Sequence, residues 1–134
     1  MGLKVNSKEV EWKKYPEGWY LTDIEYHILW KNKETRATLV LLKVPMGTVQ
    51  ELPHSHPDAN QMSFMLSGEV VLENGDTISF GEDNYGFSLR LKGEVHGPRL
   101  GSTQRVIRDF YMLQYFDGPP SKINVEETKK LTMT

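Results

Sequence analysis

The sequence predicts an all-β fold, a small barrel of two packed antiparallel sheets in jelly-roll style. Many short apolar or alternating segments are separated by turn residues, which is typical of a sandwich or barrel. The dipeptide Asn74-Gly75 lies between two alternating runs and predicts a tight hairpin in which both residues have positive φ. His96 lies far along the chain from His54 and His56. These side chains can meet only if the chain folds back on itself, as it does in such a barrel.

Each expected strand follows from its own pattern. Residues 24–30 alternate, which predicts a half-buried strand with Ile24 and Trp30 on the same buried face. Residues 37–44 form an apolar run and predict a more deeply buried strand. Further strands are expected at 61–66, 69–73 paired with 76–80, 85–91 and 105–116. Barrel-core side chains are expected in the last two, namely Tyr85, Phe87, Val106, Phe110, Tyr111 and Met112.

A chain of 134 residues predicts a single domain. We expect the barrel core at about 21–117, an N-terminal arm at 1–20 and a C-terminal tail at 118–134. The tail is expected to form one or two helical turns or to stay disordered. The arm is aromatic-rich but too short to form its own core, which predicts a homodimer in which it docks across a two-fold axis. The alternative is that the arm folds back on its own barrel as an edge strand.

Composition excludes several classes of function. The formal net charge is −2 with both signs interspersed, so there is no electrostatic argument for nucleic-acid or membrane partners. The chain contains no cysteine, which excludes disulfides and thiolate zinc sites and fits a reducing cytoplasm. The N-terminus lacks the apolar region of a signal peptide, and no apolar run is long enough to span a membrane.

The histidines predict a metal site inside the barrel. His54 and His56 are two residues apart, so an extended chain points both to one side. With His96 they would hold one divalent transition metal, because imidazole suits iron, zinc, copper and nickel. Gln61 would be a fourth ligand or would orient a metal-bound water. His27 falls on the polar side of its strand and is expected at the surface.

The segment from Gly47 through His54, His56 and Gln61 to Gly68 resembles the first motif of the cupin superfamily, and Gly93-Glu94-Val95-His96 resembles the core of the second. The resemblance covers roughly 38–115 and departs from the family pattern at Gln61, where a glutamate is usual. It implies a cupin double-stranded β-helix of RmlC-like type, with a metal (Fe, Zn, Ni or Mn) on His54, His56, Gln61 and His96. The chain is also similar to small cupins that include acetylacetone dioxygenase and the cupin domains of zinc-binding anti-sigma factors.

The resemblance implies a small-molecule ligand in the barrel, and it leaves the function open between two classes. One is a non-heme, metal-dependent dioxygenase of a small enolisable or aromatic compound, or a metal-assisted isomerase or lyase. The other is a non-catalytic, ligand- or metal-sensing module. Three neutral imidazoles and an amide leave the full charge of a divalent ion, which favours anionic oxygen ligands. No general base is obvious, since Glu51 and Asp58 flank the histidines but could equally face solvent. Three arginines are expected to be solvated, although one inward guanidinium could hold a substrate carboxylate: Arg36, Arg90 and Arg108.

Overall fold

Strands dominate the computed structural model of the chain, which describes residues 2, 4–16, 23–47, 53–97, 103–124 and 131–132. The described residues contain no helix, so the all-β prediction is confirmed. The strands are, in chain order, β1 (Lys13–Lys14), β2 (Glu25–Lys31), β3 (Thr38–Val44), β4 (His54–Ser55), β5 (Gln61–Val71), β6 (Thr77–Phe80), β7 (Gly86–Arg90), β8 (Arg105–Phe116), β9 (Ser121–Asn124) and β10 (Leu131–Thr132).

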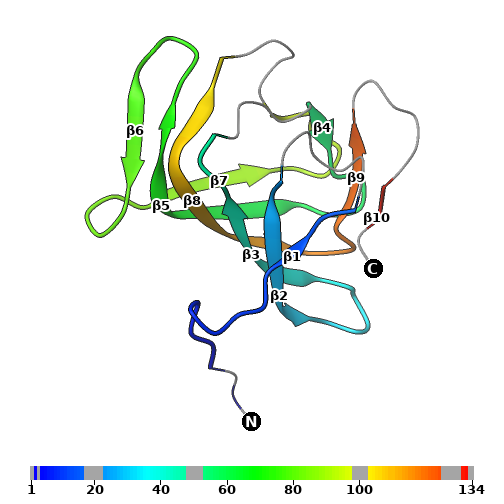
Figure 1. Ribbon diagram of the computed structural model, residues 1–134. Coiled ribbons are helices and arrows are strands. Elements are labelled where there is room, and N and C mark those ends of the chain that lie inside the picture. Colours follow the sequence, from blue (N-terminus) through cyan, green and yellow to red (C-terminus); the bar gives the residue numbers. More distant parts are fainter. Residues whose placement is uncertain are drawn as a thin grey trace.

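Within the described residues, the strands form two antiparallel sheets (Figure 1). The larger sheet has the order β1-β2-β3-β8-β5-β6, with β7 also paired to β5. The smaller sheet has the order β10-β9-β4. The long strands β5 and β8 run through the centre of the larger sheet. The strands β4 and β9 lie side by side, on the side of the molecule away from β6 (Figure 1). This arrangement leaves an interior into which both sheets can direct side chains.

The apolar core lies on the inner face of β2, β3 and β8. Its buried members are Ile24, Tyr26, Val40, Leu42, Val44, Val106 and Phe110, with Met112 packed against them. The predicted burial is therefore confirmed for the 37–44 strand and for Val106 and Phe110, whereas Tyr111 and Met112 are partly buried. The predictions were wrong for Tyr85 and Phe87, which are exposed.

Trp30 is also exposed, at 47% of its surface, although alternation predicts it on the buried face. The pairing of β2 with β3 shifts register between Ile28 and Trp30, as a β-bulge does. A bulge inserts one extra residue and so reverses which face the following side chains occupy. The alternating pattern therefore holds only up to Ile28.

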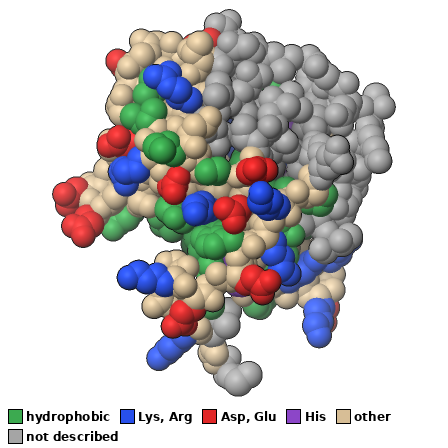
Figure 2. Space-filling model, viewed as in Figure 1, with side chains coloured by type: hydrophobic (Ala, Val, Ile, Leu, Met, Phe, Trp, Pro, Cys, Tyr) green, Lys and Arg blue, Asp and Glu red, His purple; other side chains and the backbone are tan. Residues whose placement is uncertain are grey.

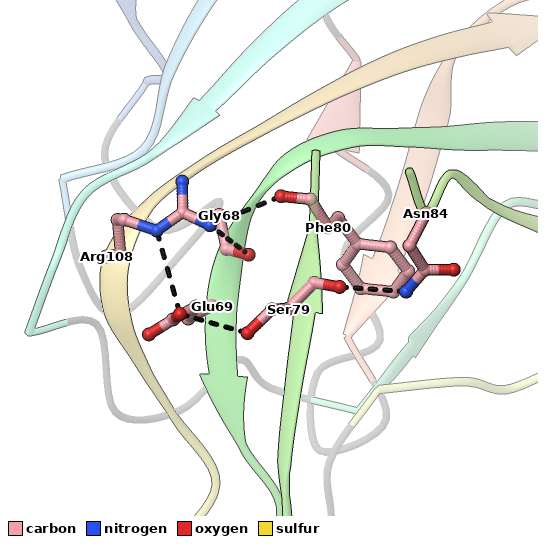
Figure 3. Close-up of polar contacts among 6 residues, drawn as sticks. All are labelled: Gly68, Glu69, Ser79, Phe80, Asn84 and Arg108. Atoms are coloured by element: carbon pink, nitrogen blue, oxygen red, sulfur yellow. Dashed lines mark hydrogen bonds and ion pairs between the residues drawn. The ribbon is translucent and has the colours of Figure 1, made fainter. Parts of the chain in front are cut away.

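Gly68 lets two strands cross closely where β5 bends. Its φ is +124°, and a Cβ there would lie 2.6 Å from the Cα of Phe110 on β8. Only glycine fits such a close backbone approach. On the same stretch, Arg108 donates to the carbonyls of Gly68 and Phe80 and lies 4.0 Å from the carboxylate of Glu69 (Figure 3). Arg108 therefore joins β8 to β5 and β6, rather than being only a solvated charge.

The predicted hairpin between β5 and β6 is present, but its turn differs from the expected one. Among the described residues, Arg36 is the one non-glycine residue with positive φ, so Asn74 does not have the expected conformation, whereas Gly75 has φ of +92°. The N–H of Gly75 donates to the carbonyl of Leu72, and the N–H of Leu72 donates to the carbonyl of Asp76. A three-residue loop with glycine in the left-handed position has this pattern, and it leaves one positive-φ residue instead of two.

Parts of the arm and of the tail pack on the barrel. In the arm, β1 pairs with β2, Tyr15 packs on Tyr26 and Trp12 lies near Tyr111, so the fold-back alternative holds for these residues. The homodimer stays a prediction, and Trp19 and Tyr20 lie outside the described residues. In the tail, β9 pairs with β4, so helical turns or disorder were wrong for 121–124. The possible helical pair Glu126 and Lys130 lies outside the described residues.

The surface carries acidic and basic side chains interspersed on the face shown in Figure 2. This mixed pattern agrees with the formal net charge of −2. Among the described residues, no helix is long and apolar enough to cross a membrane.

Candidate metal centre

The two histidine segments meet through their backbones. The N–H of His54 donates to the carbonyl of His96 at 2.9 Å, and the N–H of His96 donates to the carbonyl of His54 at 2.8 Å. The N–H of Gly93 donates to the carbonyl of His56 at 2.9 Å. The two bonds between His54 and His96 form an isolated antiparallel bridge, which brings the two segments together as the sequence predicted.

The three imidazoles converge on one point. Their ring centroids are 5.0 Å apart for His54 and His56, 4.2 Å for His54 and His96, and 5.2 Å for His56 and His96. One ring nitrogen from each lies within 4.8 Å of the others. His54 and His56 are almost wholly buried. Imidazole nitrogens bind zinc at about 2.0–2.1 Å, so three ring nitrogens gathered this closely form a candidate ligand set for one metal ion. The three histidines could therefore hold a metal ion.

Gln61 shows a polar group that lacks a partner. It is the first residue of β5, it is buried, and its Nε2 donates to Ser63 Oγ at 3.0 Å. Its Oε1 is buried and has no hydrogen-bond partner among the described residues. Gln61 lines the same cavity as the three histidines. Buried polar atoms are normally hydrogen-bonded, so this oxygen fits a position where it would contact a bound metal ion or a water on that ion.

β9 fixes the orientation of the His56 ring. Its Nδ1 lies 2.8 Å from the carbonyl oxygen of Ser121, and both residues are buried. A carbonyl can only accept, so Nδ1 carries the proton and Nε2 keeps its lone pair for a metal. The Ser121 hydroxyl in turn donates to the carboxylate of Asp58. This chain of contacts from Asp58 to Ser121 to His56 was not expected from the sequence.

Burial favours the neutral form of His56 and of His96. It lowers the pKa of His56 from 6.5 to about 4, against the opposing effect of the bond to Ser121, and the nearby charges of His96 and Lys122 lower this pKa further. Burial also lowers the pKa of His96, with a further contribution from Arg90. Lys122 is itself fully buried. A neutral imidazole is the form that binds metal, so the lowered pKa values of His56 and His96 favour metal binding at neutral pH.

A cavity of about 450 Å³ extends from the histidines into the barrel. Its polar lining includes Gln61, Ser63, Ser88 and Gln114, and its apolar lining includes Met65, Met112 and residues of the core. No aspartate or glutamate occurs among its described lining residues. Such a cavity is suited to a small, partly apolar molecule whose polar atoms reach the histidine end.

The remaining candidates lie away from the histidines or outside the described residues. His27 does not join the cluster, and its Nδ1 lies 3.0 Å from the carbonyl oxygen of Glu11. Asp58 does not line the cavity and binds Ser121 instead. Glu51 lies outside the described residues. Arg90, in contrast, does line the cavity. Its position opposite Gln61 depends on the register of β5 with β7, which the sequence pattern does not give.

No protein-family model and no curated protein matches this sequence. Solved structures do match. An RmlC-like cupin protein from Ralstonia eutropha JMP134 has a TM-score of 0.64 at 13% identity, covering 96% of this chain and 74% of that one. The chain has the cupin fold.

Two enzymes with this cupin fold are similar to the chain. An acetylacetone dioxygenase from Acinetobacter johnsonii has a TM-score of 0.64 at 17% identity, covering 98% of this chain and 85% of that one. The polyketide cyclase RemF from Streptomyces resistomycificus has a TM-score of 0.63 at 18% identity, covering 96% and 89%. These neighbours catalyse different reactions, so at these identities the cupin fold alone does not select one activity.

Proposed function

We propose that this protein is a metal-dependent cupin dioxygenase that acts on a small enolisable compound, with His54, His56 and His96 as the metal ligands. The observation that carries the proposal is the convergence of the imidazoles of His54, His56 and His96 at one end of a cavity. The fold of the acetylacetone dioxygenase from Acinetobacter johnsonii supports the choice of a diketone-like substrate class. Gln61 would be a fourth ligand or would hold a metal-bound water.

The metal ligands, Ser121 and the apolar lining would each have a separate role in this reaction. A bound divalent ion would supply a Lewis acid that favours the enolate of the substrate, and with iron it would supply oxygen chemistry. Ser121 holds His56 in the tautomer that presents Nε2. Met65 and Met112 offer an apolar wall to the body of the substrate. No carboxylate base is needed close to the substrate if its enol is already acidic, which agrees with the described lining residues.

Oxygen uptake by iron-loaded protein supplied with acetylacetone tests the proposal. One molecule of O₂ adds to one of diketone, cleaving a carbon–carbon bond to give a carboxylic acid and a dicarbonyl compound, so no other reductant is required. We expect diketone loss and oxygen uptake in equal amounts. We expect neither in His56→Ala, and an unchanged rate in His27→Ala, which removes the histidine outside the cluster.

Other outcomes would favour the alternatives. Loss of diketone without oxygen uptake would indicate isomerase or lyase chemistry. Tight binding of diketone to the metal-loaded protein, with no consumption of diketone or of oxygen, would contradict an enzymatic function and favour a sensing module.

A further inference from the structure

We propose that the substrate of this centre carries a carboxylate, and that the guanidinium of Arg90 binds it. This inference rests on the proposed function, whose substrate it specifies. Arg90 is the last residue of β7 and lies directly opposite Gln61 on β5. Both residues line the cavity. A substrate bound at the histidines is therefore next to a cation on the neighbouring strand.

The charge of the cavity favours an anion. Among its described lining residues, Arg90 and Arg105 are cationic and none is acidic. A bound divalent ion would add two further positive charges. This positive charge along the lining favours an anionic substrate over a neutral one.

Arg90 is available to a ligand because its present partner holds it weakly. Its Nη1 donates to the carboxylate of Glu94 at 3.3 Å, and the two side chains are 44% and 40% exposed. Exposed ion pairs of this kind contribute little stability. A guanidinium has five N–H donors in a planar fork that matches a carboxylate. A substrate carboxylate can therefore bind the remaining donors or replace Glu94.

A matched pair of ligands tests the inference on zinc-loaded protein by calorimetric titration. Acetylpyruvate is a β-diketone with a carboxylate, and its primary amide has nearly the same shape without the charge. We expect acetylpyruvate to bind more tightly, on the order of tenfold, because bonds between charged groups are about twice as strong as neutral ones. Arg90→Gln should remove this preference, and Arg90→Lys should restore part of it.

Arg36→Gln is the control, since it removes the same charge from an exposed arginine that does not line the cavity. We expect it to keep the preference. Equal binding of acid and amide by the unaltered protein would overturn the inference, as would equal losses in Arg90→Gln and Arg36→Gln. The zinc content of every variant is measured in parallel. Absence of zinc from the unaltered protein would overturn the proposed function itself, whereas retained zinc without a carboxylate preference would overturn the role of Arg90 alone.

Discussion

Replacing Gln61 with leucine should stabilise the metal-free protein and lower the affinity of the protein for metal. The structure gives two opposing contributions to the free energy of unfolding. Removing the buried, unpartnered Oε1 recovers about 1–3 kcal/mol, and losing the bond from Nε2 to Ser63 costs about 1 kcal/mol. Leucine is also of similar size and apolar. We therefore expect metal-free Gln61→Leu to be about 1 kcal/mol more stable than the unaltered protein.

The affinity for metal should move in the opposite direction. If Gln61 binds the metal or a water on it, its loss should lower the affinity about tenfold or more, as is typical for groups around a metal. Chemical denaturation of the metal-free forms measures the first effect, and zinc titration against a competing chelator measures the second. Gln114→Leu is the matched control, because Gln114 is a buried glutamine in the same cavity. It should leave the metal affinity unchanged.

The role of Gln61 would be contradicted if Gln61→Leu were less stable than the unaltered protein without metal and bound zinc equally tightly. In that case the orphaned oxygen has no relation to a metal. Gln61→Glu extends the test, since a carboxylate should tighten metal binding but weaken the binding of an anionic ligand by lowering the positive charge of the centre.

Three further predictions concern the supports of the site. The pKa of His56 is lowered to about 4 in the folded protein, so the unfolded chain takes up this proton at a higher pH than the folded one does. The metal-free protein should therefore lose up to about 3 kcal/mol of unfolding free energy as the pH falls from 6.5 to 4. Chemical denaturation of His56→Ala over the same range should show a smaller loss, and an equal loss would contradict the lowered pKa of His56. Gly68→Ala should lower the free energy of unfolding by at least about 3 kcal/mol, because its Cβ would meet the backbone of Phe110. Gly75→Ala, whose Cβ would lie in open space, should lower it by about 1 kcal/mol, as measured by urea denaturation of both variants. Equal losses in the two variants would show that the close approach at Gly68 does not affect stability. Ser121→Ala removes the hydrogen bond from the Ser121 hydroxyl to Asp58, and it should lower the affinity for zinc up to about tenfold. An unchanged affinity would show that β9 positions His56 without this hydrogen bond.

The parts of the fold that depend on local pattern could be predicted from the sequence. The expected strand at 105–116 coincides with β8, and the expected run at 37–44 contains β3. The convergence of His54, His56 and His96 followed from strand parity together with the resemblance to two cupin motifs. In these cases the periodicity of two and the turn residues carry the information.

The parts that depend on pairing between distant strands could not be predicted. The bulge at Ile28 and Trp30 arises from the register with β3, so alternation alone placed Trp30 on the wrong face. The tail has no strong alternating pattern, and β9 forms because β4 offers it an edge. The positions of Arg90 opposite Gln61, and of Ser121 beside His56, likewise depend on contacts between segments far apart in the chain.

The metal content of the untagged protein tests the central claim most directly. We expect close to one divalent transition metal per chain by elemental analysis, strongly reduced in His54→Ala with His56→Ala, and unchanged in His27→Ala, which removes a histidine outside the cluster. Full metal occupancy in the double variant would contradict the assignment of the three-histidine centre.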